Sequence, residues 1–526
     1  MKNKLEKLLG ASVYPASVTK AGQTTYFLAR KGLEKLVGAV GPTRLVGQAA
    51  GQIDKQKVMV GLTDAANAAG LRRALPWTMP RVIGLATSVG LGDRLGLATP
   101  GHIHAIEGLA IEPVLAQQSI REMTRTQRSA QQVIDAAMWG VFQEGFSYAG
   151  EGRAALGSAN TRRAGYYAGE ARATFSSANT PHAGASGYGA DADHLQQLED
   201  IDVTVEAGFT MFTIDPGKHV EDGADTMDAR ALNQRYERLN FDGLEISRAD
   251  LKLAYAGRKF LLEGDVVVSF DDAAFLRAAV KYGNAIAHVA SMYRHLADRA
   301  KGVFELEVSV DETASPTSPA EHYFFAAELK RLGVEWVSMA PRFVGRFEKG
   351  VDYIGDLGVF RASFAEHVAV MRTLGPYKIS IHSGSDKFSI YSIVAELTEG
   401  LVHLKTAGTS YLEALRALAK IDPALFREIL GFARGRYETD KATYHVSAEL
   451  SRVPAPESLS DGQLPGLLDD FHARQVLHVT FGSVLTAEGG AKFRDRLIRR
   501  LQENEDIHYA VLEKHLRRHV EPLVRK

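Results

Sequence analysis

Ionisable side chains follow three successive apolar runs in the second half of the chain. The first run ends in Asp311-Glu312, the second in Arg342, and the third in His382, which begins the sequence His-Ser-Gly-Ser-Asp. Packing accounts for apolar runs, but it does not require each of them to end in an ionisable group. If the runs are parallel strands of a barrel, their carboxyl ends share one rim. The sequence therefore predicts a catalytic or binding site at that rim.

The first of these runs carries a row of polar side chains along one face. Strand alternation puts four residues on that face, namely Glu305, Glu307, Ser309 and Asp311. Carboxylates in such a row are costly to bury unless they are wetted, paired or bound to a metal. We interpret the row as lining the interior of a barrel, and a solvated face of an edge strand is the alternative.

The ends of the second and third runs could bind an anion or a metal. Arg342 is followed by Arg346 and Lys349, and an arginine offers a carboxylate or phosphate a bidentate contact. A surface Arg–Glu pair explains the same residues equally well. A histidine at a strand end, such as His382, is a common metal ligand in barrels. The alternative is a core histidine, but the Ser-Gly-Ser bend that follows argues against it.

Two earlier segments supply further candidates. Asp193 and His194, in the sequence Asp-Ala-Asp-His, place a carboxylate beside an imidazole, although a helix-capping Asp with a surface His is the alternative. Asp215 ends an apolar run and could equally form a turn before Pro216.

A glycine-rich loop at Gly90–Gly96 resembles a dinucleotide fingerprint. Its last spacing is one residue too long, and no clear acidic strand end follows about twenty residues later. Nicotinamide binding is therefore not favoured, and Arg94 in this loop could instead contact the substrate.

Composition narrows the class of protein. The chain has 526 residues, with 62 basic and 63 acidic side chains and hence a net charge of −1, which gives no support for a nucleic-acid or anionic-membrane partner. With no cysteine, histidines and carboxylates remain as the strong metal ligands. The start of the chain is too charged for a signal peptide, and no apolar run approaches 18 residues. We expect a soluble, cytoplasmic protein. Whether it forms a homo-oligomer is left open.

Strand-like and helix-like segments alternate from residue 81 onward, which favours a parallel sheet. The strand-like runs begin at Arg81 and include 207–216, 304–312, 333–341, 377–384, 401–408 and Val476–Leu485. Capping boxes predict helix starts at Ser318 and Ser410. Enough units are present for a closed barrel, which is favoured over an open doubly wound sheet.

The fold class predicted is α/β, a (β/α)8 TIM-like barrel with an N-terminal cap and helical C-terminal additions. We assign residues 1–75 to the cap, 76–485 to the barrel and 486–526 to a helical tail. A Gly/Ala/Ser-rich insertion at 151–189 is interpreted as a loop, with an ordered active-site lid as the alternative.

Together these motifs resemble the tagaturonate/fructuronate epimerases, the hexuronate epimerases of bacterial uronate catabolism. The resemblance is carried by Gly90–Ile103, Asp191–Leu195, Phe209–Pro216, Ser309–Thr313, Ala340–Leu357 and Ile381–Tyr391. It implies a metal-dependent isomerase that interconverts D-tagaturonate and D-fructuronate by inversion at carbon 4. The cofactor implied is a divalent cation such as zinc or manganese, with no nucleotide.

The resemblance also implies roles for individual residues. It makes Asp193 the base, Glu307 the acid, and His194 and His382 metal ligands. Glu348 is the expected third ligand, with Asp215 and Asp311 as alternatives. The candidates for binding the small keto-hexuronate substrate are Arg94, Asp215, Asp311, Arg342, Arg346, Asp386 and Lys387.

The chemistry of carbon 4 restricts the mechanism. Its hydrogen is β to the carbonyl and is not acidic, so either a nicotinamide oxidises this carbon or the bond between carbons 3 and 4 breaks and re-forms. We expect the second route, a retro-aldol cleavage and re-addition. The alternatives are a metal-dependent sugar isomerase or aldolase acting on a keto-acid sugar, and an NAD-dependent epimerase. A non-catalytic sugar-binding protein is the least favoured.

Overall fold

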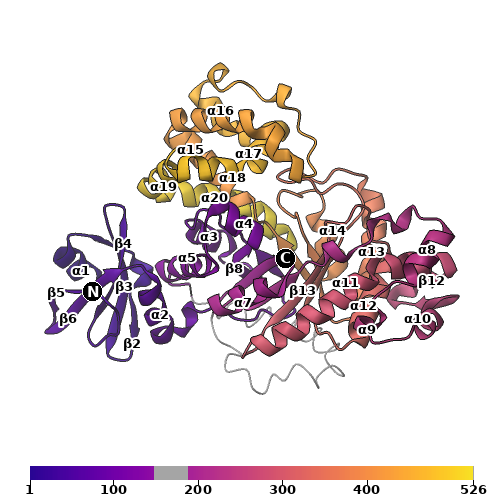
Figure 1. Ribbon diagram of the computed structural model, residues 1–526. Helices are drawn as coiled ribbons and strands as arrows, with labels where there is room; N and C mark the ends of the chain where they lie inside the picture. The colour runs from indigo at the N-terminus through magenta and orange to yellow at the C-terminus, as the bar shows by residue number, and fades with distance from the viewer. Residues whose placement is uncertain (147–186, 525–526) are drawn as a thin grey trace.

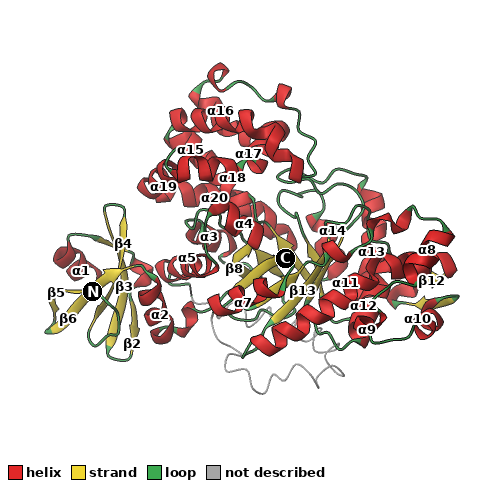
Figure 2. Cartoon of the chain, viewed as in Figure 1, coloured by secondary structure: helices red, strands yellow, loops and turns green. Residues whose placement is uncertain are grey.

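A computed structural model describes residues 1–146 and 187–524 of the chain. The expected insertion at 151–189 therefore lies outside the described residues except for its last three. The described part comprises an N-terminal β-sheet, a central barrel with its surrounding helices, and a layer of C-terminal helices (Figures 1 and 2).

The N-terminal sheet is antiparallel and is covered on both faces. Phe27 on one face packs with Leu5 of the first helix, whereas Leu28 on the other packs with Leu71 and Phe142 of two later helices. The alternation of apolar residues along the strands explains why both faces are buried. The elements are α1 (Lys2–Leu9), β1 (Ser12–Val13), β2 (Thr19–Ala21), β3 (Thr24–Lys31), β4 (Glu34–Val40), β5 (Gln48–Ile53), β6 (Gln56–Leu62), α2 (Ala65–Ala74) and α5 (Ala130–Gln143).

Eight parallel strands of the described chain close into a barrel, which confirms the predicted fold class. The last strand along the chain pairs with the first, and this pairing closes the ring. In chain order the strands are β7 (Ser88–Gly90), β8 (Glu112–Ser119), β9 (Gly189–Leu195), β10 (Met211–Ile214), β13 (Glu305–Val310), β14 (Ser338–Pro341), β15 (Lys378–Ile381) and β16 (Val402–Lys405).

Helices surround this barrel and bury its outer apolar face (Figure 2). The capping box predicted at Ser318 is present, since its hydroxyl accepts from the Glu321 amide and Glu321 accepts from the Ser318 amide. The helices are α3 (Thr99–Ile106), α4 (Ile120–Thr126), α7 (Leu198–Ala207), α8 (Ala229–Tyr236), α9 (Phe241–Leu244), α10 (Arg248–Tyr255), α11 (Asp272–Arg299), α12 (Pro319–Arg331), α13 (Leu357–Leu374) and α14 (Tyr391–Thr398), with a hairpin of β11 (Arg258–Leu261) and β12 (Val267–Phe270) before α11.

The C-terminal layer has its own hydrophobic core and corrects two expectations. Val476–Leu485 is not a strand but forms parts of two helices, and the helix near Ser410 begins at Thr409 without a side-chain cap. Glu413 instead pairs with Arg416 and Arg474. The helices are α15 (Thr409–Ile421), α16 (Pro423–Asp440), α17 (Phe471–Val479), α18 (Phe481–Thr486), α19 (Arg494–Glu503) and α20 (Glu505–Val520).

Within the described residues, no helix combines the length and the apolar character that a membrane crossing requires.

Candidate active site

A β-bulge at the end of β9 points two neighbouring side chains towards the same place. Asp193 and His194 lie opposite the single residue Thr213 of β10, so the strand carries one residue more than its partner. His194 has a φ of 52°, in the left-handed region that a bulky residue rarely adopts. Adjacent side chains of a regular strand would face opposite ways. The bulge removes that alternation and brings the carboxylate and the imidazole together.

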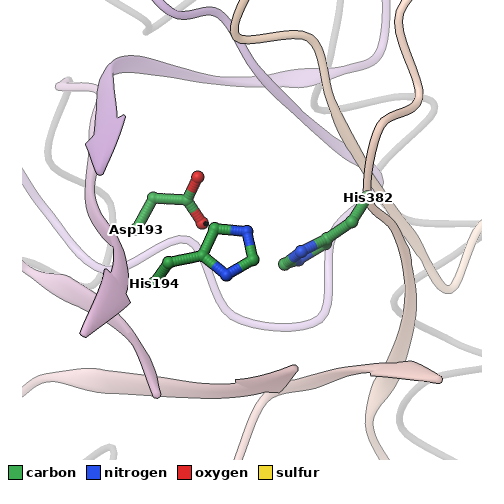
Figure 3. Close-up of side chains that lie close together, drawn as sticks. All are labelled: Asp193, His194 and His382. Carbon is green, nitrogen blue, oxygen red and sulfur yellow. Dashed lines mark ion pairs between the residues drawn. The ribbon is translucent and has the colours of Figure 1, made fainter. Parts of the chain in front are cut away.

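His382, the residue that follows β15, completes a group with this pair. The ligand atoms of Asp193, His194 and His382 all lie within 4.8 Å of one another. Figure 3 shows the two imidazole rings beside each other in an edge-to-face arrangement, and their centroids are 5.1 Å apart. Residues nearly two hundred positions apart thus meet at the carboxyl rim of the barrel, where the strand ends were expected to converge.

The polar row of β13 lies inside the barrel, directly beneath this group. Glu307 Oε1 is 2.6 Å from His382 Nε2, and Asp311 Oδ1 is 3.2 Å from His382 Nδ1. Glu307 also accepts hydrogen bonds from Ser338 and Thr213. Both ring nitrogens of His382 therefore face carboxylates, which fixes the orientation of the ring.

Lys405 at the end of β16 is the central group that sequence reasoning missed. Its Nζ lies 2.7 Å from Asp193 Oδ1, 2.7 Å from Glu307 Oε1 and 2.8 Å from Asp191 Oδ2. The side chain is 3% exposed, so these contacts replace nearly all of its hydration. A signal was available, because His403 and Lys405 are charged or polar residues on one face of an otherwise apolar strand.

The charges of this cluster shift its pKa values strongly. Burial alone would raise the pKa of Asp193 and of Glu307, but Lys405 and the neighbouring imidazoles together outweigh it and hold both pKa values below their ordinary range. Burial would lower the pKa of His194, yet Asp193, Asp215 and Asp311 together raise it to about 10. The pKa of His382 is raised as well, because Asp311 and Glu307 outweigh burial and the charge of Lys405, which both lower it. The carboxylates therefore favour a positive charge on both imidazoles.

Three of the expected substrate-binding residues lie in or beside the cluster. Asp215 Oδ2 is 3.4 Å from His194 Nδ1 and accepts a hydrogen bond from Gln196, and Asp311 contacts His382. Arg94 lines the pocket above the cluster, but its guanidinium donates to Glu122 and lies over the Phe481 ring. Arg94 is therefore already paired within the protein.

Two other arginines and Glu348 lie apart from the group of Asp193, His194 and His382. The Arg342 backbone bonds to Thr317, and neither Arg342 nor Arg346 lines the pocket, with Arg346 60% exposed. Glu348 is buried, but its carboxylate accepts from Ser447 and Gln475 and is not part of the three-residue group.

Asp386 and Lys387 belong to a buried network behind the pocket rather than to its lining. Asp386 accepts from Arg474 at 3.0 Å and from His515 at 2.6 Å. Lys387 donates to three backbone carbonyls, those of Glu348, Val351 and Ser385. Asp386, His515 and His519 form a second group that could hold a metal, but the Arg474 guanidinium already supplies the positive charge there. This network fastens the loop after His382 to α17 and α20.

The glycine-rich loop after β7 has a packing explanation. A Cβ at Gly92 would lie 2.7 Å from Ala407 Cα and 3.0 Å from the Gln117 carbonyl oxygen, so no larger residue fits between the neighbouring loops. Asp93 then accepts from the backbone amides of Leu95, Gly96 and Ala98. The loop is thus shaped by contacts within the barrel rim.

The pocket above the cluster is covered in part by the C-terminal layer. Besides Asp193, His194, His382 and Lys405, its lining includes Gln117, Arg121, Lys349, Tyr444 and His478. Gln117 donates to Asp193 Oδ2 at 2.9 Å and so holds that carboxylate together with Lys405. Tyr444 and His478 come from segments that sequence reasoning did not associate with the site.

Comparisons with known proteins point to one family. The family model described as tagaturonate epimerase (UxaE) matches residues 14–152 and 182–523. The tagaturonate/fructuronate epimerase of Thermotoga maritima is 41% identical over 453 residues, which cover 86% of this chain and 84% of that protein.

Solved structures give the same result. The fructuronate-tagaturonate epimerase of Cohnella laeviribosi complexed with one glycerol matches with a TM-score of 0.86 and 35% identity, covering 99% of this chain and 98% of that one. The same protein with two glycerols matches with a TM-score of 0.85 and 36% identity over the whole of both chains.

Proposed function

The chain belongs to the tagaturonate epimerase family, and from this membership we propose that it interconverts D-tagaturonate and D-fructuronate by inversion at carbon 4 in hexuronate catabolism. The observation that carries the proposal is the convergence of Asp193, His194 and His382 around the buried Lys405 at the rim of the barrel. It supplies a base, a proton carrier and two imidazoles at one place.

A divalent cation such as zinc or manganese fits the residues of this site. Five carboxylates, those of Asp191, Asp193, Asp215, Glu307 and Asp311, surround two imidazoles and a single lysine. The carboxylates raise the pKa of both imidazoles and so favour a proton on each ring. A bound cation would replace these protons. The His194 Nδ1 atom is buried and lies 3.4 Å from Asp215 Oδ2.

We propose that His194 and His382 would hold this cation together with Asp311. Asp311 contacts the His382 ring and its charge also acts on His194, whereas Glu348 is bound by Ser447 and Gln475. When bound, a divalent cation would polarise the substrate carbonyl as a Lewis acid.

Asp193 is the proposed base for cleavage between carbons 3 and 4. Its carboxylate lines the pocket, and Gln117 and Lys405 fix both of its oxygens. It takes the proton of the carbon-4 hydroxyl as the bond breaks, so that carbon 4 becomes an aldehyde and the electron pair of the bond passes to an enolate of carbons 2 and 3. The aldehyde rotates to present its other face, and carbon 3 of the enolate attacks it to give the inverted alkoxide.

The return of the proton is assigned to Lys405, which Glu307 helps to hold in its protonated form. Glu307 is fully buried and does not line the pocket. Lys405 does line the pocket, and its amino group contacts the carboxylates of both Asp193 and Glu307. Lys405 donates a proton to the new alkoxide and regains one from Asp193, which lies 2.7 Å away. Glu307 and Asp191 keep the amino group protonated between turnovers, because both carboxylates raise its pKa against the effect of burial.

Metal removal tests this function. Dialysis of the enzyme against a chelator should reduce the interconversion of D-tagaturonate and D-fructuronate at least about 100-fold, and added Mn²⁺ or Zn²⁺ should restore it. NMR of the sugar mixture measures the rate before and after treatment. Full activity in protein shown by metal analysis to be metal-free would reject the proposed cofactor.

A further inference from the structure

The basic side chains that line the pocket differ in how they are neutralised. Lys405 and Arg94 are bound to buried carboxylates, and Arg121 lies 3.2 Å from Glu312. Lys349 is different, because its Nζ donates to the Ser383 hydroxyl at 2.6 Å while no carboxylate of the described chain forms an ion pair with it. A partly buried lysine that forms no ion pair in a pocket, although its charge also acts on Asp311, is suited to an anionic ligand.

His478 of α17 reaches the same pocket. The ring is buried, and its Nδ1 has no hydrogen-bond partner among the described residues. Burial lowers the pKa of His478 well below its ordinary value, and Arg94 and Lys349 add to this effect, so the ring is neutral.

Gly408 leaves the space that this ring occupies. A Cβ at Gly408 would lie 2.0 Å from His478 Cε1, whereas a Cβ at Gly350 would make only an ordinary contact of 3.5 Å with His478 Nδ1. The ring therefore occupies a space that a larger residue at position 408 would fill. It lies next to Gly350, the residue that follows Lys349. A neutral imidazole there can donate one hydrogen bond to a ligand.

We propose that Lys349 and His478 form the subsite for the carboxylate of the substrate, an assignment that rests on the proposed hexuronate activity. The lysine supplies the charge and the imidazole a directional hydrogen bond, a combination that a neutral ketohexose cannot use. Lys349 bonds to Ser383, the residue after His382, so the carboxylate end of the sugar lies beside the cluster that acts on carbon 4.

Kinetics of Lys349→Gln test the subsite. The KM for D-fructuronate should rise about 10- to 100-fold, because a charge-assisted contact is lost, while kcat stays within about 3-fold. The inhibition constant of D-gluconate, which carries a carboxylate, should rise by a similar factor, and that of the neutral D-sorbitol should not change. Lys349→Arg should restore part of the affinity, and His478→Asn should raise the KM about 3- to 10-fold.

A matched charge removal provides the control. Lys252→Gln on α10 deletes a lysine paired with the exposed Asp272 and should leave KM and both inhibition constants unchanged. The subsite is overturned if Lys349→Gln leaves the KM and the inhibition constant of D-gluconate within about 2-fold of the wild-type values. It is also overturned if the inhibition constant of D-sorbitol rises by the same factor as that of D-gluconate. Failure of the wild-type enzyme to interconvert the two hexuronates would instead reject the proposed function, so the two failures can be told apart.

Discussion

Replacing Lys405 by methionine should lower kcat about 10²- to 10⁴-fold, because the proposed proton carrier of the site is lost. Methionine is similar in length, so the change removes charge more than volume. Asp191, Asp193 and Glu307 would then be buried around an apolar group. Breaking such a buried pair costs about 3–5 kcal/mol, so the free energy of unfolding should also fall at neutral pH.

The stability loss of Lys405→Met should depend on pH in a defined direction. In the wild type, the pKa values of Asp193 and Glu307 are depressed, so their contribution to stability is present above the pKa of the unfolded chain and is lost in acid. Without Lys405, both pKa values lie higher than in the wild type, and the folded variant gains relative stability as the carboxylates take up protons. Urea unfolding should therefore show a large deficit at pH 7 that shrinks towards pH 4.

Lys378→Met is the matched control for this variant. Lys378 is another buried lysine of the barrel interior, but it donates to Ser88 and to the Ala86 carbonyl and does not line the pocket. Its loss should lower stability while kcat stays within about 3-fold. Equal losses of kcat in the two variants would mean that Lys405 acts through folding alone and would contradict its proposed role.

Replacing His382 by alanine should abolish both metal binding and turnover. The ring is one of two imidazoles in the proposed site, and Glu307 and Asp311 orient it through its two nitrogens. Losing one of three ligands should weaken metal binding by more than about 100-fold, a larger effect than loss of an orienting partner. Metal content after gel filtration and the rate of interconversion by NMR measure the two effects.

His295→Ala on α11 serves as the control for the loss of an imidazole. His295 contacts Asp202 and lies outside the pocket, so its removal should change neither metal content nor turnover. If His382→Ala retained stoichiometric metal and full activity, the assignment of His382 would be wrong. Metal retained with lost activity would instead place His382 in binding or orienting the substrate.

The barrel was predictable because its strands are short apolar runs with polar ends. Glu305, Glu307 and Asp311 alternate with apolar residues, so the sequence places them on one face, and closure of the barrel makes that face the interior. The convergence of His382 with Asp193 and His194 was expected only from the family resemblance, because β9 was not among the predicted strands. The bulge that turns His194 towards the site was not predictable, because it depends on the register between β9 and β10.

The C-terminal layer was harder to predict. Val476–Leu485 is a ten-residue segment that contains three valines, a threonine and a phenylalanine, and in a buried helix the apolar residues no longer show helical periodicity. His478 was hidden for the same reason. Asp386 and Lys387 were assigned to the substrate because they follow His382, but Arg474 and backbone carbonyls satisfy them from within the fold. Sequence spacing does not reveal such internal partners.

Proton NMR of D-fructuronate incubated with the enzyme in D₂O distinguishes cleavage and re-addition from removal of the carbon-4 hydrogen. Signals of D-tagaturonate should grow until equilibrium while the hydrogen on carbon 4 remains protium, because the bond between carbon 4 and its hydrogen never breaks. Stoichiometric deuterium at carbon 4 would contradict the retro-aldol route, and no interconversion at all would contradict the proposed function.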